Sequence, residues 1–360
     1  MNISKRKFLK LSSGLLMAAP FLHGPQLALA QTEGEPVVIT PARHTHGRAI
    51  HDNLNVRSAP SIQASIIGVV RQNDIIPVLG ETTGPSPTTY NNVWYQTDVG
   101  YVYSAFLQPT DHVLNIPVEG VLPGGFWAEL SMPFSDAYEL ADAQSKVVAR
   151  YYFGCTFKVV SMVTGSNEGN EGAETIWYEV NELNSKANKF VRAEHVRPIP
   201  DDVFTPLSPD VPAEAKRIDV DLKAQLVTAY ESDVPVFTAR VATGAKFRNK
   251  EGGLDDYSTT TGQHQVFLKT PGQRMFGGLA GDANEYDLPG VSWVSYFTAS
   301  GIAFHGAYWH NDWGTPRSHG CVNMLPDDAQ WIFRWTMPQA LPENTWTRGN
   351  GDNRTTVKVF

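Results

Sequence analysis

The sequence predicts a mainly β protein made of several small domains. Its 360 residues include 24 prolines and 30 glycines, which favour many turns. Short runs of apolar and β-branched residues alternate with these turns along most of the chain. One segment has a convincing helical pattern: residues 327–335, with Pro326 at its start and acidic residues in its first turn. We therefore expect a mainly β architecture with one or two short helices.

Composition limits the possible classes of protein. A hydrophobic content of 42%, with 11% aromatic residues, is enough for packed cores and excludes wholesale disorder. The length allows two or three domains. The net charge is −8 and no run of Lys or Arg follows the N-terminus, so we do not expect nucleic acid as a partner.

The N-terminal residues 1–30 are typical of an export signal. A basic segment (Lys5, Arg6, Lys7, Lys10) precedes an apolar stretch at residues 11–22 and a cleavage site at Ala28-Leu29-Ala30. The order of residues 4–10 resembles a twin-arginine (Tat-like) signal with Lys5 in place of the first arginine, so the export route stays open. The apolar stretch is too short to span a bilayer. We expect an exported protein of the periplasm or cell wall, with no integral membrane anchor in its mature form.

After a linker at residues 31–47, residues 48–110 show short strands separated by turns. The strands are expected at residues 54–60, 66–70, 75–80, 93–97 and 100–103. With its strings LNVRSAP, WYQT and GYVYSAFLQP, the segment resembles bacterial Src-homology-3-like domains, which are small β-barrels. Residues 111–200 look like a looser second copy, because residues 177–180 and 191–198 echo residues 94–97 and 102–109. Aromatic residues of the two copies could form a ligand groove, although packing of a small barrel explains them equally well.

Residues 201–212 contain three prolines and are predicted to form a stiff linker. Strands resume in residues 213–360, first at residues 217–221 and 225–230, and the chain closes with a strand at residues 357–360. The catalytic candidates lie in this last segment.

The string Ser318-His319-Gly320-Cys321-Val322-Asn323 combines residue types that thiol chemistry needs. A second histidine, His305, lies sixteen residues before Cys321 and is followed by Gly306. The thiolate is the nucleophile, so a cysteine needs a nearby base or cation to react at neutral pH. A glycine beside the nucleophile lets a substrate carbonyl approach the backbone, where N–H groups can bind an oxyanion.

This arrangement resembles the active-site signature of the L,D-transpeptidases, the YkuD-type peptidoglycan enzymes. The strings VATG, TTTGQHQVFLKTP, FHG and SHGCVN occur in the family order, so the resemblance covers the whole of residues 213–360. It implies a β-sandwich-like catalytic domain that follows the two small Src-homology-3-like β-barrels. It also implies that Cys321 is the nucleophile and His305 the general base.

The other catalytic candidates support these two residues. His319 could tune the thiolate, line the oxyanion hole or shape the loop, and we place it in the site without a proton-transfer role. The carbonyl of Gly306 is expected to orient the His305 ring. Gly320 and the backbone N–H of Cys321 are the expected oxyanion donors.

The substrate-binding candidates surround the signature. Ser318 and Asn323 are expected to hold the loop, and Asn323 could touch substrate. The loop between the two histidines carries Tyr308, Trp309 and Arg317, and could be a lid in which Arg317 meets a peptide carboxylate. Packing of this loop on its own domain is the equal alternative. Tyr296 could face the same cleft.

Other readings of the cysteines and histidines are weaker. Cys155 lies in an apolar run and is expected to be a buried residue, since a bridge to Cys321 would consume the nucleophile. A zinc site built from His305, His310, His319 and Cys321 would lack the usual Cys-x-x-Cys spacing. We expect no metal and no cofactor.

The resemblance implies an acyltransferase of cell-wall biogenesis. Cys321 would attack a tetrapeptide stem of peptidoglycan, release D-alanine and pass the acyl group to an amine, which forms a 3→3 cross-link. The expected partners are stem peptides and wall glycan, and carbapenems are expected to acylate Cys321. Two alternatives stay open: an L,D-carboxypeptidase, in which water is the acceptor, and a non-catalytic protein that binds the cell wall through its barrels.

Overall fold

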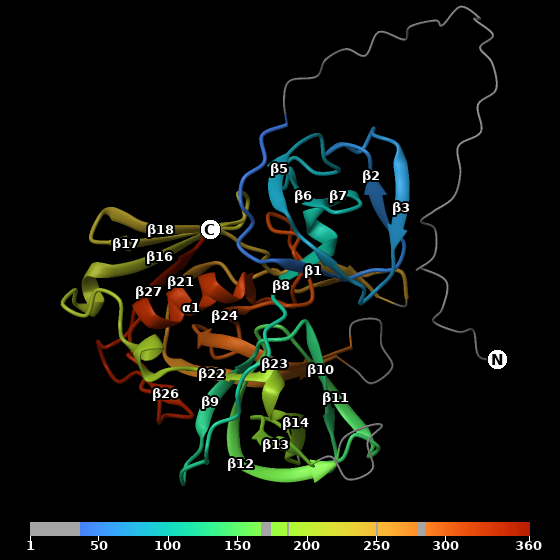
Figure 1. Cartoon of the computed structure of the whole chain (residues 1–360). Helices are drawn as coiled ribbons and strands as arrows, with labels where there is room; N and C mark the ends of the chain where they lie inside the picture. The colour runs from blue at the N-terminus through green and yellow to red at the C-terminus, as the bar shows by residue number, and fades with distance from the viewer. Residues whose placement is uncertain (1–36, 167–173, 186, 250, 279–284) are drawn as a thin grey trace, which may run out of the picture. The chain divides into compact units, whose positions relative to one another are not determined.

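Short strands joined by turns account for most of the chain, as the sequence predicts (Figure 1). The computed structural model describes residues 37–360 except 167–173, 186, 250 and 279–284. The export signal predicted at residues 1–30 and the first part of the predicted linker lie outside the described residues. The mainly β fold class is confirmed, and the described residues include one α-helix. Residues Val38–Phe360 form one compact unit.

Residues 46–110 form the first β-module, with two sheets in the orders β4-β1-β8 and β3-β2-β7-β6-β5. Its elements are His46–Ala49 (β1), Leu54–Arg57 (β2), Ile66–Val70 (β3), Ile75–Pro77 (β4), Gly80–Thr83 (β5), Val93–Thr97 (β6), Gly100–Tyr103 (β7), the 3-10 turn Ser104–Phe106 (η1) and Leu107–Thr110 (β8). The alternating apolar residues predicted in β2 and β7 supply its core, where Val56 and Val102 are buried. The module begins before residue 48, because β1 pairs with both β4 and β8.

Residues 126–198 form the second β-module, a seven-stranded sheet in the order β11-β10-β14-β13-β12-β9-β15. Its elements are Phe126–Leu130 (β9), Phe134–Tyr138 (β10), Val147–Tyr152 (β11), Thr156–Ser166 (β12), Glu174–Asn181 (β13), Lys189–Arg192 (β14), the 3-10 turn Ala193–His195 (η2) and Val196–Pro198 (β15). Both modules end with a strand, a 3-10 turn and a further strand. This shared ending agrees with the internal repeat, although a second Src-homology-3-like domain stays a prediction.

Residues 216–359 form two five-stranded sheets, in the orders β18-β17-β16-β27-β21 and β25-β24-β23-β22-β26. The first contains Lys216–Asp221 (β16), Leu226–Glu231 (β17), Val234–Arg240 (β18), Gly262–Gln265 (β21) and Thr356–Val359 (β27). The second contains Leu268–Gly277 (β22), Tyr286–Tyr296 (β23), Ala303–Gly306 (β24), Val322–Met324 (β25) and Thr347–Arg348 (β26). Lys246–Arg248 (β19) and Leu254–Asp256 (β20) form a separate hairpin. Val220 of the first sheet and Phe304 of the second belong to one buried core.

The α-helix, Pro326–Trp335 (α1), directly follows β25 in the sequence and contacts β23 and β24. Figure 1 shows α1 close to β24. Its first residue is the predicted Pro326, which suits the first helical turn because its missing N–H has no partner to lose there. Two buried lysines cap the C-terminal end of the helix. Lys216 Nζ donates to the carbonyl of Trp335 at 2.9 Å, and Lys269 Nζ donates to the carbonyl of Phe333 at 2.5 Å. The helix therefore packs on β23 and β24, and buried lysines fix its C-terminal end.

The proline-containing segment at residues 201–212 is not a free spacer. It begins with the 3-10 turn Asp201–Phe204 (η3), and a second turn, Ala213–Ala215 (η4), leads into β16. Phe204 is buried in the core between the two five-stranded sheets, where its ring centroid lies 5.9 Å from that of Trp293. The segment therefore packs as part of the domain that it was predicted only to connect.

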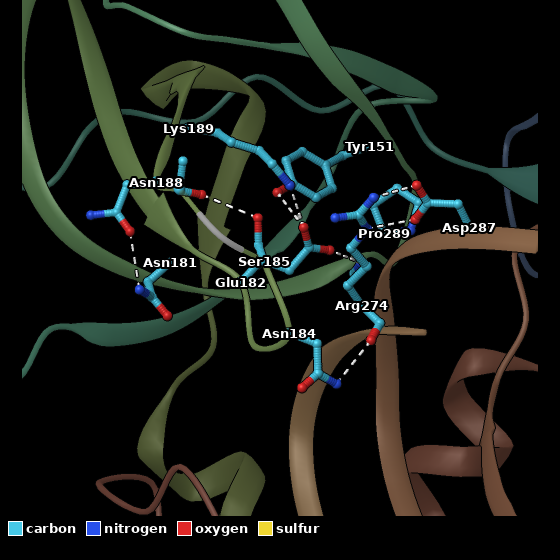
Figure 2. Close-up of polar contacts among 12 residues, drawn as sticks. Tyr151, Asn181, Glu182, Asn184, Ser185, Asn188, Lys189, Arg274, Asp287 and Pro289 are labelled. Carbon is cyan, nitrogen blue, oxygen red and sulfur yellow. Dashed lines mark hydrogen bonds and ion pairs between the residues drawn. The ribbon is translucent and has the colours of Figure 1, made fainter. Parts of the chain in front are cut away.

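The second β-module meets β22 and β23 through a buried carboxylate (Figure 2). Glu182 accepts from Lys189 Nζ at 2.5 Å and from the backbone N–H of Gly290 at 2.5 Å. Gly290 has a φ of +63°, and a Cβ there would lie 2.8 Å from the Cβ of Cys155. Glycine is required at this position because the two backbones approach so closely.

The first β-module meets the loop after β24 through hydrogen bonds. The side chain of Asn311 donates to Tyr95 and to the backbone carbonyls of Ser104 and Leu107, at 3.1–3.2 Å. Arg48 Nη2 donates to the carbonyl of Tyr308 at 3.2 Å. In the described part of the chain, no helix has the length and apolar character needed to cross a membrane.

Candidate active site

Two neighbouring parallel strands bring the two main catalytic candidates to the same face of a sheet. In the register of β24 and β25, His305 lies opposite Asn323 and Phe304 lies opposite Val322. Because side chains alternate along a strand, Cys321 shares a face with Asn323 and therefore with His305. Phe304 and Val322, on the opposite face, belong to the buried core. The alternation of side chains along β24 and β25 therefore places neighbouring residues on opposite faces, one in the core and the next in the site.

His305 is fixed in one orientation and is 2% exposed. Its Nδ1 lies 3.1 Å from the carbonyl oxygen of Gly306, the residue expected to orient it. A carbonyl oxygen only accepts, so Nδ1 carries the proton and the lone pair of Nε2 is left as the base. Burial lowers the pKa of His305 to about 4, which keeps the imidazole neutral at physiological pH.

Cys321 directly precedes β25 and is partly exposed. Its thiol donates to the carbonyl oxygen of Gly301 at 3.7 Å. Burial raises the pKa of Cys321 to about 11, although a hydrogen bond from the backbone of Ala303 opposes the rise. The resting thiol is therefore protonated, and a base must take its proton during attack. A neutral imidazole on the adjacent strand is such a base.

A tight turn shapes the backbone before the thiol. Gly320 has a φ of +114°, which a residue with a side chain rarely adopts. Ser318 Oγ donates to the carbonyl of Cys321 at 2.5 Å and accepts from the backbone N–H of Gly320 at 3.2 Å. Thr259 Oγ1 donates to the carbonyl of Gly320 at 2.7 Å. Ser318 thus holds the turn, and the Gly320 N–H, an expected oxyanion donor, is bonded to it.

His319 lies in an aromatic cage. Its ring stacks on Phe247 of β19, with centroids 4.6 Å apart and planes 12° apart, and it also contacts Tyr257 and Tyr286. Burial lowers the pKa of His319. Its Nε2 is buried and has no hydrogen-bond partner within the described residues. The ring is placed for packing under the β19–β20 hairpin.

Two further candidates lie beside the catalytic pair. Tyr296 is opposite Ala303 in the register of β23 and β24, and it packs with Cys321 on one apolar cluster. Burial raises the pKa of Tyr296. Asn323 is 1% exposed, and its amide lies 3.0 Å from Nε2 of His310. Asn323 therefore fixes the loop after β24 through its contact with His310.

The other two substrate candidates have protein partners. Tyr308 is buried against the second β-module, where its ring stacks on Tyr152 at 5.2 Å and its hydroxyl donates to Pro289 at 2.9 Å. Arg317 forms a two-pronged ion pair with Asp312. A substrate carboxylate would have to compete with Asp312 for this arginine.

The cysteines and histidines of the described ranges were also compared with the needs of a metal site. Both Cys155 and Cys321 are free thiols. Cys155 is fully buried, and burial raises its pKa. Within the described ranges, no group of three or more His, Cys, Asp or Glu residues could hold a metal ion.

Several residues of the site were not singled out from the sequence. Phe247, Tyr257 and Tyr286 form the cage around His319. The one available signal was the position of Tyr257, just before the threonine-rich turn at residues 258–261. Phe247 and Tyr286 carry no motif, because each reaches His319 only through tertiary packing.

Comparison with known proteins identifies two parts of the chain. Residues 215–359 match the family described as the L,D-transpeptidase catalytic domain, and residues 52–108 match the bacterial SH3 domain. No curated protein matches the sequence.

Among solved structures, the chain is similar to L,D-transpeptidases. One from Enterococcus faecium is 19% identical over 41% of this chain and 50% of its own, with a TM-score of 0.30. One from Mycobacterium smegmatis is 14% identical over 56% of this chain and 100% of its own, with a TM-score of 0.32. L,D-transpeptidase 3 of Mycobacterium tuberculosis is 15% identical over 56% of this chain and 79% of its own, with a TM-score of 0.31.

The matched part of this chain spans about half the length of the Enterococcus faecium L,D-transpeptidase. At such identities and TM-scores, these likenesses do not support a shared activity. The two family matches agree with the resemblance seen in the sequence. The chain therefore carries an L,D-transpeptidase catalytic domain at residues 215–359, preceded by a bacterial SH3 domain at residues 52–108.

Proposed function

We propose that the protein is an exported cysteine L,D-transpeptidase that acts on peptidoglycan stem peptides. The observation that carries the proposal is that a neutral, oriented imidazole on β24 and a protonated thiol directly before β25 share one face of the sheet. His305 keeps Nε2 available because Nδ1 donates to Gly306, and Cys321 lies on the same face. A neutral base beside a neutral thiol can transfer the proton only as the nucleophile attacks.

In the first half-reaction, Cys321 Sγ attacks the carbonyl carbon that precedes the terminal D-alanine of a tetrapeptide stem. The thiol proton moves to Nε2 of His305, and the backbone N–H of Cys321 stabilises the oxyanion. The C–N bond to D-alanine then breaks, and the proton on His305 passes to the leaving amine. A thioester on Cys321 and free D-alanine result.

In the second half-reaction, the side-chain amine of another stem attacks the thioester. His305 takes a proton from this amine, the C–S bond breaks, and the thiolate is protonated again. The product is a 3→3 cross-link. Carbapenems would acylate the same sulfur, and the SH3 domain would serve to hold the enzyme on wall glycan.

Incubation of the mature protein with disaccharide-tetrapeptide tests the proposal. We expect a cross-linked dimer and one free D-alanine for each cross-link. Free D-alanine with only the shortened monomer would indicate the L,D-carboxypeptidase alternative, in which water resolves the thioester. No D-alanine from a folded preparation would favour the non-catalytic, wall-binding alternative.

A further inference from the structure

A groove of about 570 Å³ lies where both β-modules meet the catalytic domain. The first module contributes Arg48 and His51, the second contributes Arg150 and Lys189, and the catalytic domain contributes Leu288 and Trp309, among others. None of the three parts could form this groove by itself.

The inner wall of the groove adjoins the reaction centre. Leu288 and Trp309 pack against the apolar cluster that Cys321 also contacts. The ring of Trp309 is 5.7 Å from the ring of His305. A ligand in the groove would therefore lie against Trp309, whose ring neighbours that of His305.

The groove is rich in positive charge, but most of that charge is compensated. Arg150 forms an ion pair with Asp136, Lys189 with Glu182, and Arg274 with Asp287. Figure 2 shows Lys189 directed at Glu182 and Arg274 facing Asp287. These three cations already have carboxylate partners in the protein.

Arg48 differs from them because its partners are neutral. It is 4% exposed, and its guanidinium donates to Gln108 Oε1 and Asn73 Oδ1, both at 2.9 Å, and to the carbonyl of Tyr308. It also lies over the ring of Tyr152, 4.2 Å from the centroid. No ion pair to Arg48 occurs among the described residues.

Burying a cation without a counter-charge costs free energy. A guanidinium has five N–H groups, and three hydrogen bonds from that of Arg48 are seen here. Burial lowers the pKa of Arg48, and the nearby positive charge of Arg150 adds to this effect. Both features favour an anion in the groove. The planar fork of arginine suits a carboxylate in particular.

We propose that Arg48, a residue of the first β-module, binds a carboxylate of the peptide substrate in this groove. The inference rests on the proposed function, since stem peptides supply such carboxylates beside the bond that reacts. It also assigns the role expected of Arg317 to a different arginine, because Arg317 is already paired with Asp312. The first module would then read the substrate directly as well as tether the enzyme.

Binding to a form that cannot turn over tests the inference. Isothermal titration calorimetry would compare the full chain carrying Cys321→Ala with the same chain carrying Arg48→Gln in addition. The probes are a stem tetrapeptide and versions of it whose carboxylates are converted to amides one at a time. We expect Arg48→Gln to weaken binding of the free-acid peptide about 10- to 100-fold, the usual range for a hydrogen bond to a charged group. One amidated peptide should bind both forms equally weakly.

Matched variants separate substrate binding from a structural role. Arg48→Lys keeps the charge and should recover part of the affinity. Arg57→Gln removes another arginine of the same module, whose Nη1 donates to the carbonyl of Ala64, and should change nothing. Equal binding with and without Arg48 would overturn the inference. So would an equal loss for the acid and for every amide, which would mean that Arg48 only ties the modules together. The proposed function is tested separately, by measuring release of D-alanine by the wild-type protein, which keeps Cys321.

Discussion

Two histidines accompany Cys321 in the candidate site, His305 on β24 and His319 in the turn before the thiol, and they have opposite surroundings. On the β24 side, His305 is 2% exposed and one ring nitrogen is fixed by the carbonyl of Gly306. On the β19–β20 side, His319 is held by ring contacts with Phe247, Tyr257 and Tyr286. The surroundings of His305 fix which ring nitrogen carries the proton, whereas those of His319 fix only the position of the ring.

The difference teaches that a histidine in a site motif is assigned by its partners. A base needs one nitrogen oriented by an acceptor so that the other is left with its lone pair. His305 has this arrangement. The ring of His319 offers faces to aromatic neighbours, and its buried Nε2 has no partner among the described residues.

Removing the base should produce the largest effect of any single histidine replacement. His305→Ala is expected to lower kcat for D-alanine release about 10²- to 10⁴-fold, the usual contribution of a general base. His264→Ala, which changes a histidine on β21, is the matched control and should retain activity. If His319→Ala costs more than His305→Ala, the two roles are exchanged.

The two histidines should also differ in their effect on the stability of the protein in acid. The pKa of His305 is about 4 in the folded state, below the ordinary value of about 6.5 for histidine in an unfolded chain. The unfolded state therefore binds more protons between these values, so stability falls as pH drops from 6.5 to 4. For His305 alone, the loss from pH 7 to pH 5 is about 2 kcal/mol.

Urea denaturation at pH 7 and pH 5 measures this loss. His305→Gln cannot titrate in this range, so its stability should depend less on pH than that of the wild type. His319→Gln should keep most of the wild-type dependence, because His305 is still present. A His305→Gln protein with an unchanged pH dependence would contradict the buried, neutral state of the imidazole.

For His319, the shape of the ring should matter more than a proton. Loss of the His319 ring contacts in His319→Ala should lower kcat/KM up to about 10-fold, the range expected for aromatic pairs. His319→Phe keeps a ring between Phe247 and Tyr286 and should recover most of this loss. Steady-state kinetics of both variants decide the matter: a His319→Phe protein as impaired as His305→Ala would give His319 a proton-transfer role.

The smallest effect is expected from the other thiol. Cys155 is fully buried at the joint with the second β-module, where its thiol donates to the carbonyl of Pro289 at 3.3 Å. Cys155→Ala should leave D-alanine release within a few-fold and lower the free energy of unfolding by about 1 kcal/mol. A parallel loss of activity and of a disulfide would refute the reading of Cys155 as a core residue.

Local features of the chain were accessible from the sequence. The strands of the first β-module and of the catalytic domain follow alternating apolar residues, and α1 begins at the predicted Pro326. The hydrogen bond between His305 and Gly306 joins adjacent residues, so a short motif was enough to suggest it. Features that depend on a few neighbouring residues leave a pattern in the sequence.

Features that depend on distant segments left no such pattern. Glu182 reaches the N–H of Gly290 only because the second β-module packs on β23. Phe247 meets His319 only after the β19–β20 hairpin folds over the turn before Cys321. The proline-containing segment at residues 201–212 likewise resembled a spacer, because the burial of Phe204 depends on packing against Trp293.

The identity of the nucleophile is tested most directly by intact-mass measurement after incubation with meropenem. A thiol beside a neutral base should open the lactam and keep the acyl group. We expect the wild type to gain the mass of one inhibitor, with the adduct on the peptide that contains Cys321, and the Cys321→Ala protein to gain nothing. An unchanged mass for the folded wild type, or an adduct that persists in Cys321→Ala, would contradict the assignment of Cys321 as the nucleophile.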